Sequence, residues 1–174
     1  MPAGVIIHGG YAGSAFPAAP GSRNFIDYAT ILSGDIGAAG IATDNSYSVV
    51  NITTGTLDGL TITAGNGTNS PSTCGGGATF FGAVTVANCT FTSNTSTNGG
   101  AIDVIPPFSA ETISSCRFVS NSASAFGGAV NCQSGDLELA DCVFVENKAL
   151  VGGAVAATTL DGTRCTFTRN RALG

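Results

Sequence analysis

Apolar residues alternate with polar residues in short segments that recur along the chain. In Cys89-Thr90-Phe91-Thr92 every second side chain is apolar, and Val84 and Val86 alternate in the same way just upstream. Such alternation places the apolar side chains on one face of a β-strand. Long Leu/Glu/Lys/Ala patterns, which favour helices, are absent. The chain therefore predicts many short, half-buried strands separated by turns.

Two phrases recur four times in the same order, a Gly-Gly-Ala step and then Cys-x-Phe-x-x-Asn. The first phrase begins at Gly76, Gly99, Gly127 and Gly152, and the second at Cys89, Cys116, Cys142 and Cys165. From cysteine to cysteine the spacing is 27, 26 and 23 residues (89 to 116, 116 to 142, 142 to 165). This period is too short for a helical hairpin repeat and fits one coil of a parallel β-helix.

The first half of the chain follows the same plan less regularly. Leu60 and Ile62 lie 29 residues ahead of Cys89 and Phe91, and residues 29–32 and 5–7 supply earlier rungs. We predict an all-β fold, a right-handed single-stranded parallel β-helix of about seven coils, ~30 Å long at ~4.8 Å per coil.

One domain is expected over residues 1–174. Residues 1–75 would form leader coils with loops, and residues 76–174 the four repeats. Segments 13–27 and 65–77, rich in Gly, Pro and Ala or Ser, are predicted to be loops that leave the helix. The first repeat departs from the others by having Thr79 where they have Ile or Val after the Gly-Gly-Ala step.

The repeated aromatic and amide residues predict two ladders in the interior. We expect one aromatic column from Phe91, Phe118, Phe144 and Phe167. A buried Asn is costly unless its amide is hydrogen-bonded, and stacked amides can bond one another and the turn backbone. We therefore predict an asparagine ladder made by Asn94, Asn121, Asn147 and Asn170.

Six cysteines are present, and four of them occupy the same position of the repeat. Core packing is the favoured role for Cys89, Cys116, Cys142 and Cys165, with disulfides or a metal site as the alternatives. Cys132 falls where other coils have Val104 and Ala157, so it too is predicted in the core. No Cys-x-x-Cys pair exists, which argues against zinc.

The chain has few charged residues, and this argues against some classes of binding partner. Charged residues make up 10% of the chain and the net charge is −5. With so few cations there is no basic patch for phosphates, so nucleic acid is not an expected partner. No apolar run is long enough to span a bilayer and no signal peptide is apparent.

The repeated phrases resemble the repeat of the polymorphic outer membrane protein family. Residues 76–174 carry this resemblance, with Gly-Gly-Ala-(Ile/Val) and Phe-x-x-Asn. Residues 4–66 are similar to leader coils of large secreted right-handed β-helix proteins, through Gly9-Gly10-Tyr11-Ala12-Gly13 and Leu57-Asp58-Gly59-Leu60. The resemblance implies a fragment of a surface-displayed passenger domain with an adhesive role. We expect an extracellular or outer-membrane surface location, and both ends of the chain look cut.

Catalysis by a pectate-lyase-like, polysaccharide-degrading β-helix is the alternative function. The acidic residues look scattered, with no two at equivalent positions of neighbouring coils on one face, so no catalytic residue is assigned. His8 has no nucleophile at a defined spacing and is interpreted as a turn residue. No cofactor is expected; Asp35 and Asp58 are interpreted as turn caps, with Ca²⁺ binding as an alternative.

The leading hypothesis is thus a non-catalytic surface module. Its partner would be a polysaccharide or a cell-surface protein. Exposed coil ends carry unpaired strand edges, so end-to-end self-association is a further expectation.

Overall fold

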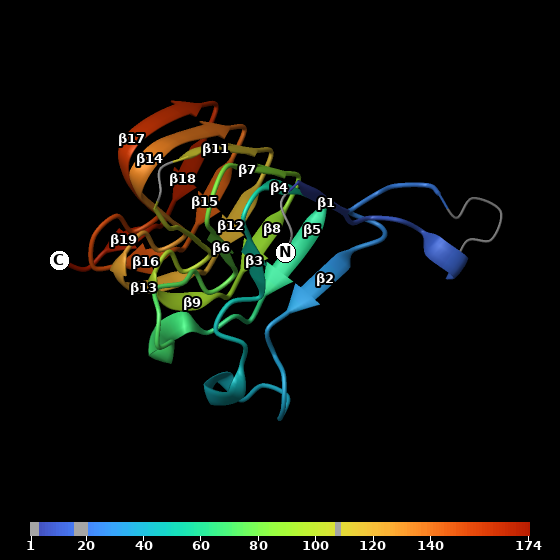
Figure 1. Ribbon diagram of the computed structural model, residues 1–174, viewed down its shortest axis with the longest axis horizontal. Helices are drawn as coiled ribbons and strands as arrows, with labels where there is room; N and C mark the ends of the chain where they lie inside the picture. Colours follow the sequence, from blue (N-terminus) through green and yellow to red (C-terminus); the bar gives the residue numbers. More distant parts are fainter. Residues whose placement is uncertain (1–3, 16–20, 107–108) are drawn as a thin grey trace.

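A computed structural model describes residues 4–15, 21–106 and 109–174, and its described strands form three sheets that run along the molecule (Figure 1). The first sheet has the order β1-β4-β7-β11-β14-β10-β6-β3, with β17 beside β14. Its strands are β1 Val5–His8, β3 Val50–Ile52, β4 Gly55–Asp58, β6 Ala78–Phe80, β7 Val84–Ala87, β10 Ile102–Val104, β11 Ser109–Ser114, β14 Val130–Ala140 and β17 Val155–Thr163.

The other two sheets are shorter. The second has the order β18-β15-β12-β8-β5-β2, and the third β19-β16-β13-β9. Their strands are β2 Thr30–Ser33, β5 Leu60–Thr63, β8 Thr90–Thr92, β9 Thr95–Asn98, β12 Arg117–Val119, β13 Ser122–Phe126, β15 Val143–Val145, β16 Lys148–Ala149, β18 Thr166–Thr168 and β19 Arg171–Ala172. Single 3-10 turns occur at η1 Gly13–Ala15, η2 Ala42–Asp44 and η3 Gly67–Asn69.

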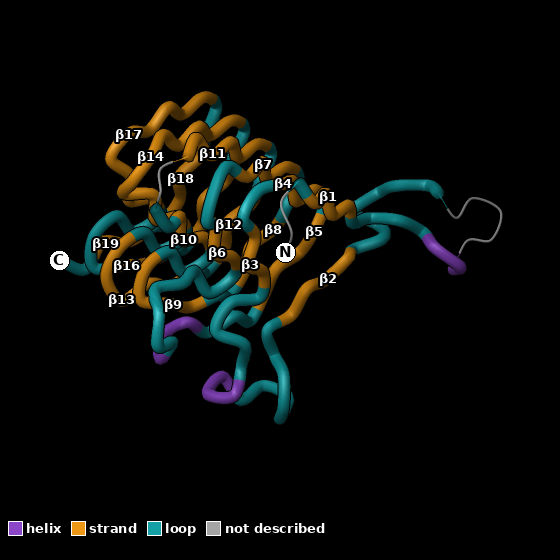
Figure 2. Tube along the Cα trace, in the orientation of Figure 1, coloured by secondary structure: helices purple, strands orange, loops and turns teal. Residues whose placement is uncertain are grey.

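In each coil the chain passes through the first sheet, then the second and then the third, and ladder neighbours come from successive coils (Figure 2). The first sheet takes two consecutive strands from several coils, such as β6 and β7 or β10 and β11. The pairings between the named strands are parallel, for example β8 with β12 and β12 with β15. This is a β-solenoid, and the predicted all-β parallel class is confirmed. The described strands support about five turns, since the second sheet stacks six strands. The predicted number of seven coils is not confirmed, and right-handedness stays a prediction.

The core lies between the sheets and is filled by the inward side chains of each strand. Phe91, Phe118 and Phe144 have no exposed surface. Their rings stack at centroid distances of 5.2 and 4.7 Å, and Phe167 continues the stack at 4.8 Å from Phe144. In-register parallel strands repeat at about this spacing, which is why one aromatic per coil yields a continuous column. The Phe167 side chain lies in the last coil and is 52% exposed.

Two corners of each coil use left-handed backbone at residues other than glycine. One corner is the residue before the repeated Cys and the other the residue before the repeated Asn, with φ between 52° and 56°. The residues are Asn88, Ser115, Asp141 and Arg164 at the first corner, and Ser93, Ser120, Glu146 and Arg169 at the second. This conformation reverses the side-chain direction locally, so only two residues separate the end of one strand from the start of the next, for example Ala87 from Thr90.

The register predicted for the first Gly-Gly-Ala phrase is wrong by one residue. Ala78 pairs with Ile102, so Gly75-Gly76-Gly77 occupies the place of Gly99-Gly100-Ala101. Because residues 75–77 are all glycine, the sequence alone fits either register and does not reveal the shift. Thr79 accordingly pairs with Asp103 on the outward face, and Ala78 fills the core slot that other coils give to Ile or Val.

The Gly-Gly step is needed for two separate reasons. Gly99, Gly127 and Gly152 take φ between 54° and 65°. The second glycine of each step faces the next coil: a Cβ on Gly100 would lie 2.3 Å from the Gly128 carbonyl oxygen. Positive φ at the first position and close coil contact at the second both exclude larger residues.

Candidate functional site

The repeated asparagines form a hydrogen-bonded column at the corner after the second sheet. Asn94, Asn121 and Asn147 are fully buried. Each side-chain nitrogen donates to the next Asn Oδ1 and to a backbone carbonyl of the preceding coil. For Asn121 these bonds reach Asn147 Oδ1 and the Phe91 carbonyl, both at 3.0 Å.

The oxygen of each amide in this column is also used. Asn121 Oδ1 accepts from the backbone nitrogen and the side-chain nitrogen of Asn94, both at 3.1 Å. Asn170 accepts in the same way from Asn147 at 2.9 Å. Asn94 Oδ1, at the start of the column, accepts from Gly65 N at 3.0 Å. The amide donors and acceptors of the column bond one another and the backbone, so these residues offer little to an external ligand.

The cysteines are free thiols, and five of the six are buried. Cys89, Cys116, Cys142 and Cys165 follow one another at the first corner. Burial raises the pKa of Cys116 well above its ordinary value, which keeps that thiol protonated and unreactive. Cys132 is fully buried and pairs with Ala157 at an equivalent core position.

Opposite charges stack outside the column, at equivalent positions of adjacent coils. Arg164 donates to both carboxylate oxygens of Asp141, at 2.6 and 2.7 Å. Arg169 donates to Glu146 at 2.8 Å. Lys148 and Arg171 are neighbours of like charge in adjacent coils. The two ion pairs are exposed and hold the left-handed corners of neighbouring coils together weakly.

Unrepeated residues gather where segment 21–29 crosses the outside of the solenoid. Arg23 forms an ion pair with Asp58 at 2.9 Å and donates to the Gly9 carbonyl at 2.8 Å. His8, at the end of β1, contacts the same carboxylate at 3.1 Å, and Asn88 donates to it at 2.8 Å. We name segment 21–29 the strap, because these contacts fasten it to two coils.

Asp58 is the common acceptor of these contacts. Partial burial raises the pKa of Asp58, but hydrogen bonds from Arg23 and Asn88 outweigh it, so the pKa lies below its ordinary value. The carboxylate is therefore ionised at neutral pH and anchors the strap. Asp35, the other predicted turn cap, accepts from Gly40 N at 3.1 Å with both oxygens.

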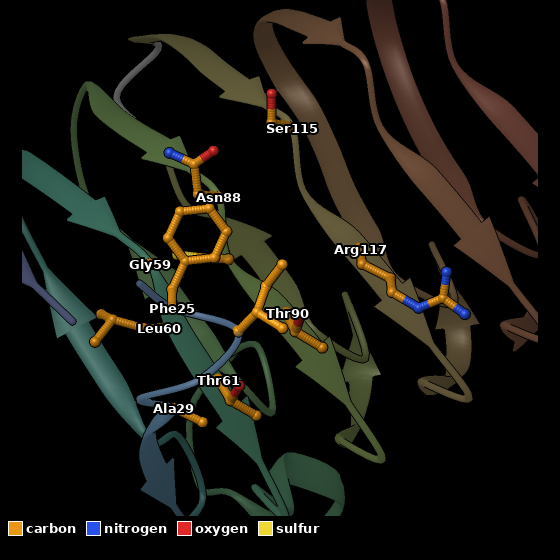
Figure 3. A pocket seen from close by; sticks show the side chains of 11 residues that line it. Phe25, Ala29, Gly59, Leu60, Thr61, Asn88, Thr90, Ser115 and Arg117 are labelled. Atoms are coloured by element: carbon orange, nitrogen blue, oxygen red, sulfur yellow. The ribbon is translucent and has the colours of Figure 1, made fainter. Parts of the chain in front are cut away.

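A hollow of about 360 Å³ lies between the strap and the second sheet (Figure 3). The strap contributes Phe25 and Ile26, and the sheet contributes side chains from three successive coils, including Thr61, Thr90 and Arg117. Figure 3 shows the Phe25 ring beside Asn88, while Arg117 lies on the far side of Thr90 with its guanidinium directed away from the ring. Within the described part of the chain the Arg117 side chain has no hydrogen-bond or ion-pair partner, so it is available to a ligand.

Replacing Arg23 by Ala should release the strap without unfolding the solenoid. The change removes the ion pair to Asp58 and the bond to Gly9, while the core ladders are untouched. We expect faster cleavage by chymotrypsin after Phe25 and Tyr28, with an unchanged far-ultraviolet circular dichroism spectrum. Arg117→Ala is the matched control and should keep the wild-type cleavage rate. Equal rates in the two variants would show that Arg23 does not hold the strap.

The prediction that no two acidic residues stack in neighbouring coils is wrong. Glu138 pairs with Asp161 across β14 and β17, and both side chains are exposed. The repeat phrases do not cover this part of the coil, and β14 and β17 contain a register shift between Cys132 and Asp136 that hides the equivalence. The two carboxylates repel each other and make this face acidic.

Two further carboxylates are buried, which the sequence interpretation missed. Glu111 faces the core and its Oε2 accepts from Val84 N at 2.8 Å. Glu111 lies two positions before the buried Ile113 on the same strand, and this alternation is a sequence signal for its inward direction. Asp103 is 1% exposed, although it is on the outward face of β10. Burial raises the pKa of Asp103 to about 6, and the hydrogen bond from Asn131 only partly offsets this.

Within residues 4–15, 21–106 and 109–174, no cluster of three or more His, Cys, Asp or Glu side chains is arranged to hold a metal. No helix in the described ranges has the length and apolar character to cross a membrane.

Comparison with known proteins bears on the repeat. Residues 88–104 match the Chlamydia polymorphic membrane protein repeat. This range runs from Asn88 at the first corner to Val104 in β10 and includes Cys89, Phe91 and Asn94. No curated protein and no solved structure matched the chain. The repeat match and the β-solenoid together confirm the predicted resemblance, and they support a β-helix repeat module of the cell-surface kind.

Proposed function

We propose that this chain is a non-catalytic adhesive module that binds a surface glycan through its unrepeated outward residues. The observation that carries the proposal is the hollow beside the strap. The repeated Asn and Phe side chains are directed inward and bonded or packed there, so they leave recognition to other residues. The repeat match, whose family is one of membrane proteins, supports display at a cell surface.

The hollow combines groups that suit a sugar. Thr61, Thr90 and Arg117 are in register on successive strands and form a polar row along the rod axis. Phe25 supplies an exposed aromatic ring at the edge of this row. Sugar rings offer C–H faces to aromatic groups and hydroxyls to polar side chains, and a row at regular spacing fits an extended polymer.

Glycan binding tests this proposal. The purified chain is applied to an array of neutral and acidic polysaccharides, and bound ligands are measured by calorimetry. Phe25→Ala and Arg117→Ala should each weaken binding roughly tenfold, about 1.4 kcal/mol. Arg171→Ala, an exposed arginine of the last coil, is the matched control and should bind as the wild type does. Absence of any bound glycan, or equal losses in all three variants, would contradict the proposal.

An assay of sugar release from the same polysaccharides distinguishes adhesion from the alternative function, a polysaccharide-degrading enzyme. Its one supporting observation is the stacked pair Glu138 and Asp161. We expect no sugar release from pectin or alginate. Turnover that Glu138→Gln abolishes would replace adhesion by catalysis. End-to-end association through the exposed Phe167 and Leu160 of the last coil stays a prediction.

A further inference from the structure

A short column of polar side chains on the outward face of the first sheet is buried. Thr79, Asp103 and Asn131 are partners across β6, β10 and β14, and they are 0%, 1% and 7% exposed. The glycine turns lie close to the backbone of these strands. A Cβ on Gly99 would lie 2.8 Å from Asp103 N, and one on Gly127 would lie 2.8 Å from Asn131 N. The buried column therefore adjoins the same turns that define the repeat.

Hydrogen bonds satisfy this column only in part. Thr79 Oγ1 accepts from Gly75 N at 3.1 Å and contacts Ser48 Oγ at 3.1 Å. Asn131 Nδ2 donates to Asp103 Oδ1 at 2.7 Å. Asp103 Oδ2 and Asn131 Oδ1 are both buried, and neither has a partner among the described residues. Asn98 Oδ1, in the residue directly before Gly99, is buried without a partner as well.

The unpartnered atoms are all oxygens that accept, and one of them belongs to a carboxylate. No Lys, Arg or His of the described ranges forms an ion pair with Asp103. A buried carboxylate normally pairs with a cation or coordinates a metal. Hard cations such as Ca²⁺ take carboxylate and amide oxygens as ligands and fill the remaining positions with backbone carbonyls and water.

We propose that Asp103 and Asn131 form a binding site for a small hard metal cation, with Asp103 Oδ2 and Asn131 Oδ1 as its side-chain ligands. The cation neutralises the carboxylate and occupies both unpartnered oxygens. It also ties β10 to β14, so it stabilises the stacking of two coils. This site is separate from the hollow beside the strap and does not depend on glycan binding.

A surface hollow lies beside the end of the column. The column continues from Asn131 to Ala156 in β17, where a methyl group replaces the amide. Ala156 lines a hollow of about 480 Å³ together with Gln133 and Gly152. The strand pairing of Asn131 with Ala156 places the end of the column next to this hollow.

Thermal unfolding with and without metal tests the site. The chain is stripped with a chelator and dialysed, and its melting temperature is followed by circular dichroism as CaCl₂, MgCl₂ or NaCl is added. A saturable rise in melting temperature is expected for at least one cation, because a ligand that binds only the folded state stabilises it. Calorimetric titration of the same protein should show a single site.

Three variants make the test specific to the column. Asp103→Asn should abolish the rise, and Asn131→Ala should reduce it; Ala already occupies this position in the next coil, so folding is preserved. Asp136→Asn removes an exposed carboxylate of β14 and should respond as the wild type does. The proposal is overturned if no cation raises the melting temperature, or if Asp103→Asn retains the full rise.

Discussion

Asn121→Ala is expected to lower the free energy of unfolding by about 4 kcal/mol. The substitution leaves the backbone N–H of Asn94 and one hydrogen of its side-chain amide without an acceptor. Both groups are in a fully buried corner, where each unpaired donor costs ~1–3 kcal/mol. The Phe91 carbonyl and Asn147 Oδ1 also lose one bond each. Urea unfolding followed by circular dichroism measures the change.

Asn170→Ala is the graded control for this prediction. Asn170 accepts the same pair of bonds from Asn147, but it is partly exposed in the last coil, so water can replace the lost oxygen. We expect a clearly smaller loss of stability than for Asn121→Ala. If the two variants lose the same small amount, the column is not a main source of stability and the Phe stack carries the rod instead.

The parts of the fold that were predictable are those in which each coil carries the same local information. Phe118 and Phe144 recur at one position, and in-register parallel pairing then places their rings in contact. Asp141 and Arg164 likewise occupy equivalent positions of adjacent coils, so the repeat spacing is enough to bring them together. Inward or outward direction alternates along a strand, so a register that is correct at one residue predicts its neighbours.

The parts that could not be predicted depend on turns and on unrepeated segments. Three successive glycines before Ala78 allow two registers, and only strand pairing selects one. The strap meets Asp58 through Arg23, a contact 35 residues apart in sequence (23 to 58) that no repeat encodes. Alternation places the Asp103 side chain on the outward face, yet it is buried, and alternation along a strand does not predict that. Sequence patterns therefore predict the interior better than the candidate sites.

Asp103→Asn is expected to stabilise the metal-free protein by about 3 kcal/mol at pH 7. In the folded chain burial raises the pKa of Asp103 to about 6, against ~3.9 for an aspartate in an unfolded chain. Between these values the unfolded chain releases a proton that the folded chain keeps. The wild type therefore loses stability as the pH rises from about 4 to about 6, and the loss is complete above that range. Each pKa unit corresponds to ~1.4 kcal/mol.

An amide at this position removes the titration and can be satisfied by its neighbour. The Asn94, Asn121 and Asn147 amides already show that stacked side-chain amides exchange donors and acceptors from coil to coil. A substituted amide can accept from Asn131 Nδ2, as the carboxylate does, and it carries no charge to bury. The difference in unfolding free energy between variant and wild type should thus grow from near zero at pH 4 to its full value near pH 7.

Urea unfolding in chelator-treated buffer at several pH values measures this difference. Using the difference cancels the groups common to both proteins, including Asp58, whose lowered pKa acts in the opposite direction. Asp136→Asn, with an exposed carboxylate on β14, should give a much smaller change with pH. A difference that is independent of pH would mean that the Asp103 carboxylate is already neutralised in the folded chain. Adding the cation that binds the site should reduce this pH-dependent difference between variant and wild type, because cation binding to the ionised carboxylate offsets the cost of ionising Asp103.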